Sequence, residues 1–222
     1  MRKYLILAVA AGTSLLTALS AVPASAATVD VLTTGKTGGS NVSVGAVLKA
    51  NLAAGVSADF YQSASSTTGV KCGKSSFSAK VTANPAKPGT AKESLTAQSF
   101  SSCTANVAGV TSVKSVTLAN LPNNVTVSDS KGTPVKVSGT SSSKPLKTTV
   151  VLNTVLGTVT CVYTAASISG SASNTGNTIS FSKQKFTKSS GPSTCFSSGY
   201  FTAKYGPVTD SSVSGSPKVF VN

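Results

Sequence analysis

Residues 72–103 read CGKSSFSAKVTANPAKPGTAKESLTAQSFSSC, and residues 161–195 read CVYTAASISGSASNTGNTISFSKQKFTKSSGPSTC. In each stretch a cysteine follows a run that contains valine, a turn separates two strand-like segments, and a second cysteine closes the stretch. The two cysteine separations, 31 and 34 residues, are nearly equal. The similarity predicts two hairpin-like units, each closed by its own disulfide, Cys72–Cys103 and Cys161–Cys195.

The first 26 residues have the layout of a signal peptide. Arg2 and Lys3 give a positive start, residues 4–19 form an uncharged apolar run, and Ala24-Ser25-Ala26 fits a signal peptidase site. The run is too short for a helix that stays in a bilayer, so we expect no stable membrane anchor. The sequence therefore predicts a mature chain of residues 27–222 that is secreted and acts extracellularly or in loose association with the cell wall.

Export affects how the cysteines are interpreted. An oxidising compartment favours two disulfides among four cysteines, which allow three connectivities. The likeness of the two stretches favours the pairing given above over the crossed pairings. Zinc binding is the alternative, but the chain has no histidine and no two cysteines are close in sequence. We therefore expect no metal site.

Charge and composition limit the partners. Loss of residues 1–26 removes Arg2 and Lys3 and leaves 17 lysines against five acids, a net charge of about +12. Such a balance favours polyanionic surroundings such as an anionic wall polymer. The alternative is that scattered lysines only keep a Ser/Thr-rich surface soluble and protect sheet edges. The mature chain lacks arginine, whose planar fork suits phosphate and base recognition, so we expect no specific nucleic-acid binding.

Hydrophobic periodicity indicates an all-β fold. A two-residue period over 76–81, 42–52, 125–127 and 135–137 is typical of half-buried strands. Continuous β-branched runs at 150–152 and 159–163 indicate strands buried on both faces or a bulge. Turn signals separate these segments, and only residues 45–54 could pass for a helix. Many short strands at regular spacing predict an antiparallel β-sandwich, immunoglobulin-like or related, built from the two disulfide-closed units.

The domain count is left between two interpretations. Residues 27–222 form either one continuous sandwich domain or two packed halves, 27–140 and 141–222. The Gly/Ser-rich segment 138–144 is the best boundary between them, although its composition does not stand out strongly as a linker.

The chain resembles small secreted β-sandwich proteins common in actinobacteria. The resemblance rests on the signal peptide, the Thr/Ser/Gly-rich alternating strands, and the Asn84-Pro85…Pro88-Gly89 turn between two cysteines. It implies a secreted β fold. Because it includes no catalytic motif, it carries over no functional residue.

Catalytic chemistry finds little support. Without histidine, neither a Ser-His-acid nor a Cys-His mechanism can operate within the chain. The pairs Ser141/Lys144 and Ser182/Lys185 match a Ser-x-x-Lys pattern that chance explains in a sequence so rich in both residues. A carboxylate pair would have to come from the five acids, of which only Asp59 has aromatic neighbours. We therefore expect no enzyme activity, no catalytic residue and no cofactor.

One cluster of lysines and aromatic residues is a candidate binding surface. Residues 183–188 and 200–205 flank the last cysteine and could form neighbouring strands that offer cations and aromatic faces to an anionic glycan or polymer. The alternative is that the aromatic side chains fill the core. The candidate residues are Lys183, Lys185, Phe186, Lys188, Tyr200, Lys204 and Tyr205.

Two classes of function follow from these observations. The first is a non-catalytic extracellular or wall-associated protein that binds a polyanionic wall polymer or a protein partner. The second is a structural module of a surface assembly with no ligand of its own. A long apolar edge strand would favour assembly, whereas lysine-bearing edges would favour a monomeric binder.

Overall fold

The computed structural model describes residues 28–222, so the predicted signal peptide, residues 1–26, lies outside the described part of the chain. Every regular element within the described part is a β-strand. In chain order the strands are β1 (Leu32–Thr34), β2 (Ser40–Asn41), β3 (Val47–Asn51), β4 (Ala58–Tyr61), β5 (Gly69–Ala83), β6 (Thr90–Ala105), β7 (Val110–Ala119), β8 (Asn123–Ser128), β9 (Pro134–Ser138), β10 (Leu146–Thr154), β11 (Gly157–Ala165), β12 (Ser167–Ser173), β13 (Thr178–Ser190), β14 (Ser198–Tyr205), β15 (Thr209–Asp210) and β16 (Val219–Val221).

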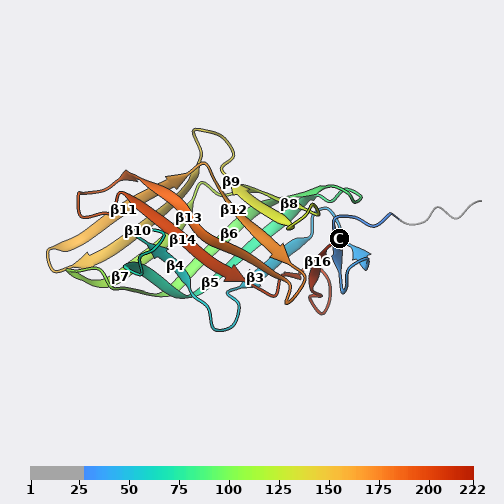
Figure 1. The fold of residues 1–222 in the computed structure, drawn as a ribbon, viewed down its shortest axis with the longest axis horizontal. Coiled ribbons are helices and arrows are strands. Elements are labelled where there is room, and N and C mark those ends of the chain that lie inside the picture. Colours follow the sequence, from blue (N-terminus) through green and yellow to red (C-terminus); the bar gives the residue numbers. More distant parts are fainter. Residues whose placement is uncertain (1–27) are drawn as a thin grey trace, which may run out of the picture.

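Eight of these strands form a closed barrel (Figure 1). Their order is β12-β9-β8-β6-β5-β4-β14-β13, and the pairing of β12 with β13 completes the ring. All neighbours are antiparallel, and each of the eight strands has a hydrogen-bonded neighbour on both sides. The all-β antiparallel prediction is therefore confirmed, but the sheet closes on itself where a sandwich was expected.

The remaining strands extend the barrel at its two ends. The second half of β13 pairs with β11, which continues through β10 to β7 at the left of Figure 1. At the other end β3 pairs with the second half of β5, and β15 pairs with β3. A separate small sheet, β16-β1-β2, lies at this end beside the C-terminus. The molecule is therefore elongated along the barrel.

Both predicted disulfides are present, but they do not close similar units. Cys72 and Cys103 lie directly opposite each other in the β5–β6 hairpin. Cys161 lies on β11, and its partner Cys195 lies in the loop that follows β13. The pairs β4–β14, β7–β10 and β9–β12 each join strands from the two sides of residue 140. Cysteine spacing reports the length of a segment and not its strand partners, so the prediction of two hairpin units is not met.

The two-residue periods correctly locate several core strands. Val125 of β8 lies opposite Val137 of β9, and Val127 lies opposite Val135. All four valines are buried, and the residues between them are less buried or exposed. The alternation of apolar and polar residues therefore predicted both the positions of these two strands and the face that points into the core, as expected when one face of a sheet is covered.

The continuous β-branched runs coincide with irregular pairing. The β10–β7 register shifts between Val151 and Leu152, and the β11–β13 register shifts between Val162 and Tyr163. In each case the extra residue belongs to the partner strand, Lys114 of β7 or Ser189 of β13. The two runs themselves keep a regular alternation, with Val150, Leu152, Cys161 and Tyr163 buried and the residues between them less buried. An irregularity is therefore present in the pairing of both runs, as predicted, but it lies in the neighbouring strand, and burial on both faces is not observed.

One predicted strand is shorter than its pattern. The alternation runs from Val42 to Leu52, whereas β3 covers only Val47–Asn51. Gly45 has φ +95°, in the region open mainly to glycine, and it turns the chain before β3 begins. As a result Val44 is 65% exposed instead of facing the core.

An aromatic cluster packs where the barrel meets its extension through β11. The ring of Phe60 on β4 meets Tyr163 of β11 edge-on at 5.0 Å and Phe186 of β13 at 5.8 Å. Gly199 of β14 lies directly under the Phe60 ring, and a Cβ at this position would overlap the ring. The Phe60 ring therefore occupies the space that a side chain at position 199 would need.

Replacing Gly199 with Ala should destabilise the protein by steric overlap alone, because the Gly199 backbone does not need a left-handed conformation. Overpacking of this kind costs about 1–3 kcal/mol in the free energy of unfolding, measurable by urea denaturation. Phe60→Leu should cost less in the Gly199→Ala background than in the wild type, since it relieves the overlap. Unchanged stability of Gly199→Ala would contradict this packing.

Candidate functional site

Two of the predicted binding residues belong to the core. Phe186 is 4% exposed and packs on Phe60, and Tyr205 is 2% exposed. The Tyr205 hydroxyl lies 2.9 Å from Ser75 Oγ and accepts a hydrogen bond from Gln98 Nε2 at 3.0 Å. Since both side chains point inward from strands of a closed barrel, neither can contact a polymer on the outside.

A third predicted residue, Lys188, holds a loop. Its ammonium group donates to the backbone oxygens of Pro192 and Cys195, at 3.2 and 3.3 Å. The side chain is half-buried and lies against the loop that carries the Cys161–Cys195 disulfide. Lys188 therefore has a structural role in addition to its charge.

The other predicted residues lie on the outer side of the barrel. Lys185 of β13 is directly opposite Tyr200 of β14, and Tyr200 is in turn opposite Tyr61 of β4. Directly opposite residues share a face of an antiparallel sheet, so these three side chains form a row across three strands. Lys204 lies on the same side further along β14, opposite Ser180.

A second row runs beside the first. Thr202 of β14 lies opposite Asp59 of β4, which lies opposite Lys71 of β5. The backbone N–H of Lys183, in the bulge of β13, donates to Thr202 Oγ1 at 3.0 Å, so Lys183 adjoins this row. We call the residues of both rows that carry a cation or a phenol ring the lysine–tyrosine face: Tyr61, Lys71, Lys183, Lys185 and Tyr200.

Sequence reasoning missed Tyr61 and Lys71, because β4 lies far from β13 and β14 in the chain. The only signal was the alternation of residues 58–61, which places Asp59 and Tyr61 on one side and Phe60 on the other. Desolvation, followed by the charge of Asp59 and a hydrogen bond with it, raises the pKa of Tyr61 above its usual value. Tyr61 is therefore a neutral phenol at physiological pH.

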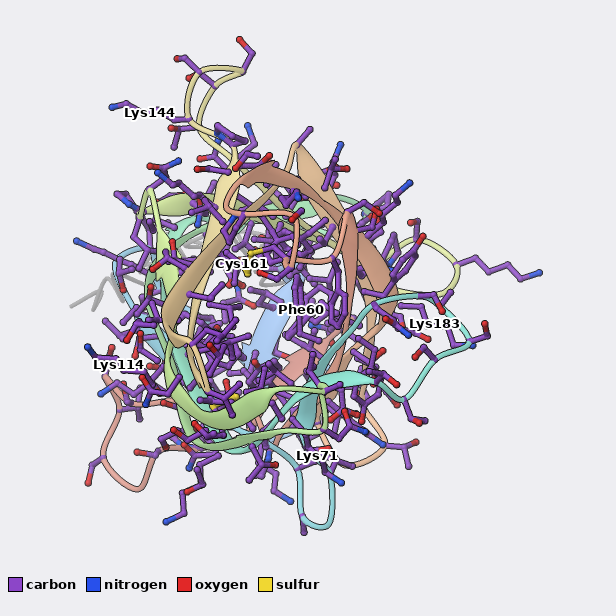
Figure 2. All side chains as sticks on the ribbon, turned by 90° about the vertical axis from the view of Figure 1, so that its left-hand side faces the viewer. Phe60, Lys71, Lys114, Lys144, Cys161 and Lys183 are labelled. Atoms are coloured by element: carbon purple, nitrogen blue, oxygen red, sulfur yellow. A yellow bond between two sulfur atoms is a disulfide. The ribbon has the colours of Figure 1, made fainter. Side chains whose placement is uncertain are left out.

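The two kinds of charge are distributed unequally over the molecule. Every described lysine is exposed except Lys147 and Lys188, which are half-buried. None of the five acids is exposed: two are buried and three are partly buried. In Figure 2, a view along the barrel, labelled lysines lie around the periphery, with Phe60 and Cys161 toward the centre. The surface is therefore more positive than the net charge alone suggests.

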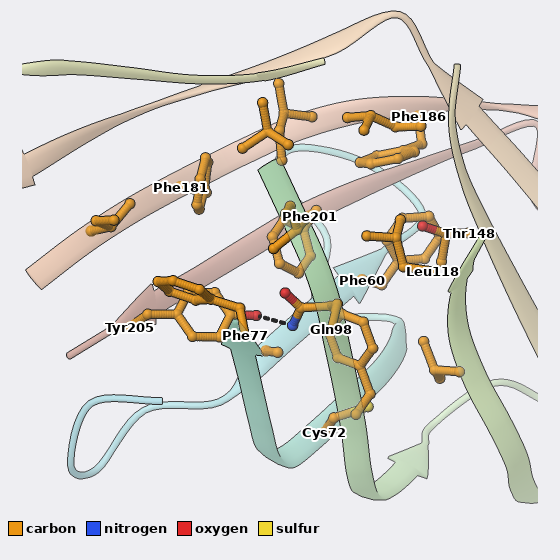
Figure 3. A pocket seen from close by; sticks show the side chains of 18 of the residues that line it. Phe60, Cys72, Phe77, Gln98, Leu118, Thr148, Phe181, Phe186, Phe201 and Tyr205 are labelled. Carbon is orange, nitrogen blue, oxygen red and sulfur yellow. Dashed lines mark hydrogen bonds between the residues drawn. The ribbon is translucent and has the colours of Figure 1, made fainter. Parts of the chain in front are cut away.

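An apolar cavity of about 90 Å³ lies between the barrel strands and the strands β7 and β10 (Figure 3). Its walls are mainly aromatic and aliphatic, and the hydrogen bond between Gln98 and Tyr205 is one of its few polar features. Ser75 Oγ donates to the backbone oxygen of Ser99, so the Tyr205 hydroxyl donates to Ser75. Burial raises the pKa of Tyr205 to about 12, against the opposing effect of these hydrogen bonds.

Glu93 is the acid of this interior. It lies on β6, is 7% exposed, and lines both the main cavity and a smaller one of about 30 Å³. Desolvation raises the pKa of the Glu93 carboxyl to about 7. The carboxylate of Asp59, in contrast, accepts a hydrogen bond from Ser57 at 2.7 Å and interacts with Tyr61 on the outer side of β4. Asp59 also borders the main cavity, but it alternates with the inward-pointing Phe60 along β4, so its carboxylate is directed to the outer side of the strand.

Residues 28–222 hold no cluster of three or more Cys, Asp or Glu side chains placed to bind a metal ion. In that same range no helix is long and apolar enough to cross a membrane. Comparison with known proteins finds no matching family model, no similar curated protein and no similar solved structure.

Glu93 should make the stability of the protein fall as the pH rises. The folded state holds the proton up to about pH 7, whereas the unfolded chain releases it near pH 4.5, so folding is favoured by protonation in this window. Between pH 4.5 and 7.5 the loss should approach about 3 kcal/mol, since each pKa unit corresponds to about 1.4 kcal/mol.

Urea denaturation of the oxidised protein at pH 4.5 and 7.5 measures this difference. Glu93→Gln keeps the shape of the side chain but cannot ionise, so its stability should change much less between the two pH values. A wild type that is more stable at pH 7.5 than at pH 4.5 would contradict the assignment.

Proposed function

We propose that this protein is exported and acts as a non-catalytic binding protein that attaches to a polyanionic polymer of the cell wall or extracellular space. The observation that carries the proposal is the unequal exposure of the charged side chains. Nearly all lysine side chains are exposed to solvent, whereas every acidic side chain is at least partly buried. A surface of this kind attracts polyanions in any orientation. The two disulfides fit an oxidising environment, as expected outside the cell.

The lysine–tyrosine face is the proposed place of closest contact. It combines three exposed lysines with two half-buried tyrosine rings on four neighbouring strands. A tyrosine ring offers an apolar surface together with a hydroxyl, and thus suits the face of a sugar ring. The lysine ammonium groups are point charges on flexible stems that suit anionic substituents at variable positions. The face is therefore suited to an anionic polysaccharide whose charged groups need not occupy one fixed arrangement.

The closed barrel favours binding over the alternative of self-assembly. Each of its eight strands is paired on both sides, so the barrel offers no free edge to a second copy. Strand β7, at the end of the additional sheet, carries an exposed lysine, Lys114, in its middle. Charged side chains on such a strand oppose edge-to-edge association.

Export predicts a defined N-terminus. If the Ala24-Ser25-Ala26 site is cleaved, mass spectrometry of protein from culture medium should find a chain that begins at Ala27. Recovery of only the intact 222-residue chain, in the cell fraction, would contradict export.

Polymer binding is tested by retention on purified cell walls and on heparin resin. Retention should be strong at low salt and should collapse near physiological ionic strength, where charges more than about 8–10 Å apart are screened. Changing Lys71, Lys183 and Lys185 together to Gln should lower the eluting salt concentration more than changing Lys36, Lys87 and Lys131, a matched trio of exposed lysines elsewhere. Both triple variants remove three positive charges, so a difference between their eluting salt concentrations reports the position of the lysines and not the net charge.

Equal losses from the two trios would reject the lysine–tyrosine face and leave only diffuse attraction. Absence of retention on either material at low salt would reject polyanion binding altogether.

A further inference from the structure

A second cavity opens at one end of the molecule. It has a volume of about 240 Å³ and is walled by the inner sides of β10 and β11, the β6–β7 turn at residues 107–109, and the disulfide loop at residues 194–196. Phe60 and Val70 form its inner wall and also line the interior cavity, so the Phe60 ring separates the two spaces. We call this cavity the end pocket.

The end pocket is built to receive hydrocarbon. No charged side chain lines it. The hydroxyl of Thr154 donates to the backbone oxygen of Gly157 at 2.8 Å and accepts from the Leu156 N–H at 3.2 Å. Tyr163 and Thr194 supply the other two side-chain hydroxyls of the lining. Because so few polar side chains line the pocket, a polar group inside it would find few partners and would lose hydrogen bonds to water.

The rim of the end pocket carries apolar side chains that the fold does not require. Val155 and Leu156 are the two central residues of the β10–β11 turn, positions that usually hold Asn, Asp or Gly. They are 73% and 96% exposed. The Val155 N–H donates to the backbone oxygen of Gly109, which ties the tip to the β6–β7 turn across the pocket. Val44 and Val213 are also exposed but line none of the three cavities, so this rim is distinguished by its position beside a pocket.

A positive charge lies beside the disulfide-loop wall of the pocket. The ammonium group of Lys188 lies 3.3 Å from the backbone oxygen of Cys195, and Cys195 lines the pocket. Two of its three N–H groups are engaged by the loop, which leaves one for another acceptor. An occupant with an anionic head therefore meets complementary charge as its tail enters.

We propose that the end pocket binds a single-chain anionic amphiphile, with the hydrocarbon chain between the β10–β11 tip and Phe60 and the acidic head near Lys188. The volume fits one chain, since an apolar cavity of roughly 150 Å³ accepts benzene and pockets for drug-sized ligands begin near 300 Å³. This site lies inside the barrel wall and is distinct from the lysine–tyrosine face on its outer side.

The test is calorimetric titration of the oxidised mature protein with monomeric dodecanoate and with dodecyltrimethylammonium, which has the same chain length and the opposite charge. Dodecanoate should bind, and the cationic amphiphile should bind at least about tenfold more weakly, because the ammonium group of Lys188 repels a cationic head. Equal affinity for the two would overturn the anionic head, and binding of neither would overturn the site.

Variants locate the site. The double variant Val155→Ser/Leu156→Ser changes only exposed side chains and should weaken dodecanoate binding by about tenfold, because chain contacts are lost. The control Val44→Ser/Val213→Ser, which removes comparable exposed valines elsewhere, should have less than about a twofold effect. Val110→Phe enlarges a lining residue and should also weaken binding, with thermal unfolding used to verify that the variant is folded. Equal effects of the two Ser variants, or unchanged binding by a folded Val110→Phe, would overturn the assignment.

Two other occupants would give different results. A membrane contact would show binding to anionic phosphatidylglycerol vesicles that Val155→Ser/Leu156→Ser abolishes, with no binding of monomeric dodecanoate. A second copy of the chain would show concentration-dependent dimers in sedimentation that dodecanoate leaves unchanged. Either result would replace the proposed ligand.

Discussion

The architecture depends on the change of partner along β13. Its residues 178–181 pair with β12 and close the barrel, while residues 187–190 pair with β11 on the same side. The bulge between Phe181 and Gln184 separates these two halves, with Lys183 at φ +49°. A bulge strengthens the local twist of a strand, so the second half of β13 is free to diverge from β12. That divergence makes room for β11, β10 and β7, and hence for the end pocket that they enclose.

Local patterns in the sequence were sufficient to predict several of the strands and the pairing of the cysteines. The valines of β8 and β9 show their inward face by alternation. The disulfides pair as predicted, although the two stretches that they close are not the similar hairpin units from which the pairing was inferred. The ring could not be predicted, because it depends on pairs such as β4–β14 and β9–β12, which alternation does not specify. The same reason explains the candidate site. Tyr200 and Lys185 lie close enough in the sequence to be predicted as neighbours, whereas Tyr61, 139 residues before Tyr200, joins them only through the β4–β14 pairing.

Burial of the acidic side chains affects which charges a partner meets at the surface, in addition to the net charge of the protein. Glu93 and Asp210 are buried, so neither carboxylate lies at the surface where it would directly repel a bound polyanion. Asp210 lies in the β15 region, where its carboxylate accepts a hydrogen bond from the backbone N–H of Ser212 at 2.9 Å. Lysines in a closed barrel, meanwhile, alternate with core residues on every side, as Lys136 does between Val135 and Val137. The pleat of the sheet thus spreads the positive charge evenly, which suits a long flexible polyanion better than a compact ligand.

The short strand β4 joins the two proposed surfaces and keeps them independent. Its pleat directs Asp59 and Tyr61 outward and Phe60 inward, so one strand contributes to both the lysine–tyrosine face and the end pocket. Backbone hydrogen bonds to β5 on one side and to β14 on the other hold β4 in place. A chain that enters the end pocket meets Phe60, whose side chain points away from the outer face of β4. Coupling between two sites requires a shared element with two states. Because β4 is fixed along both edges, hydrocarbon inside and polymer outside should bind without affecting each other.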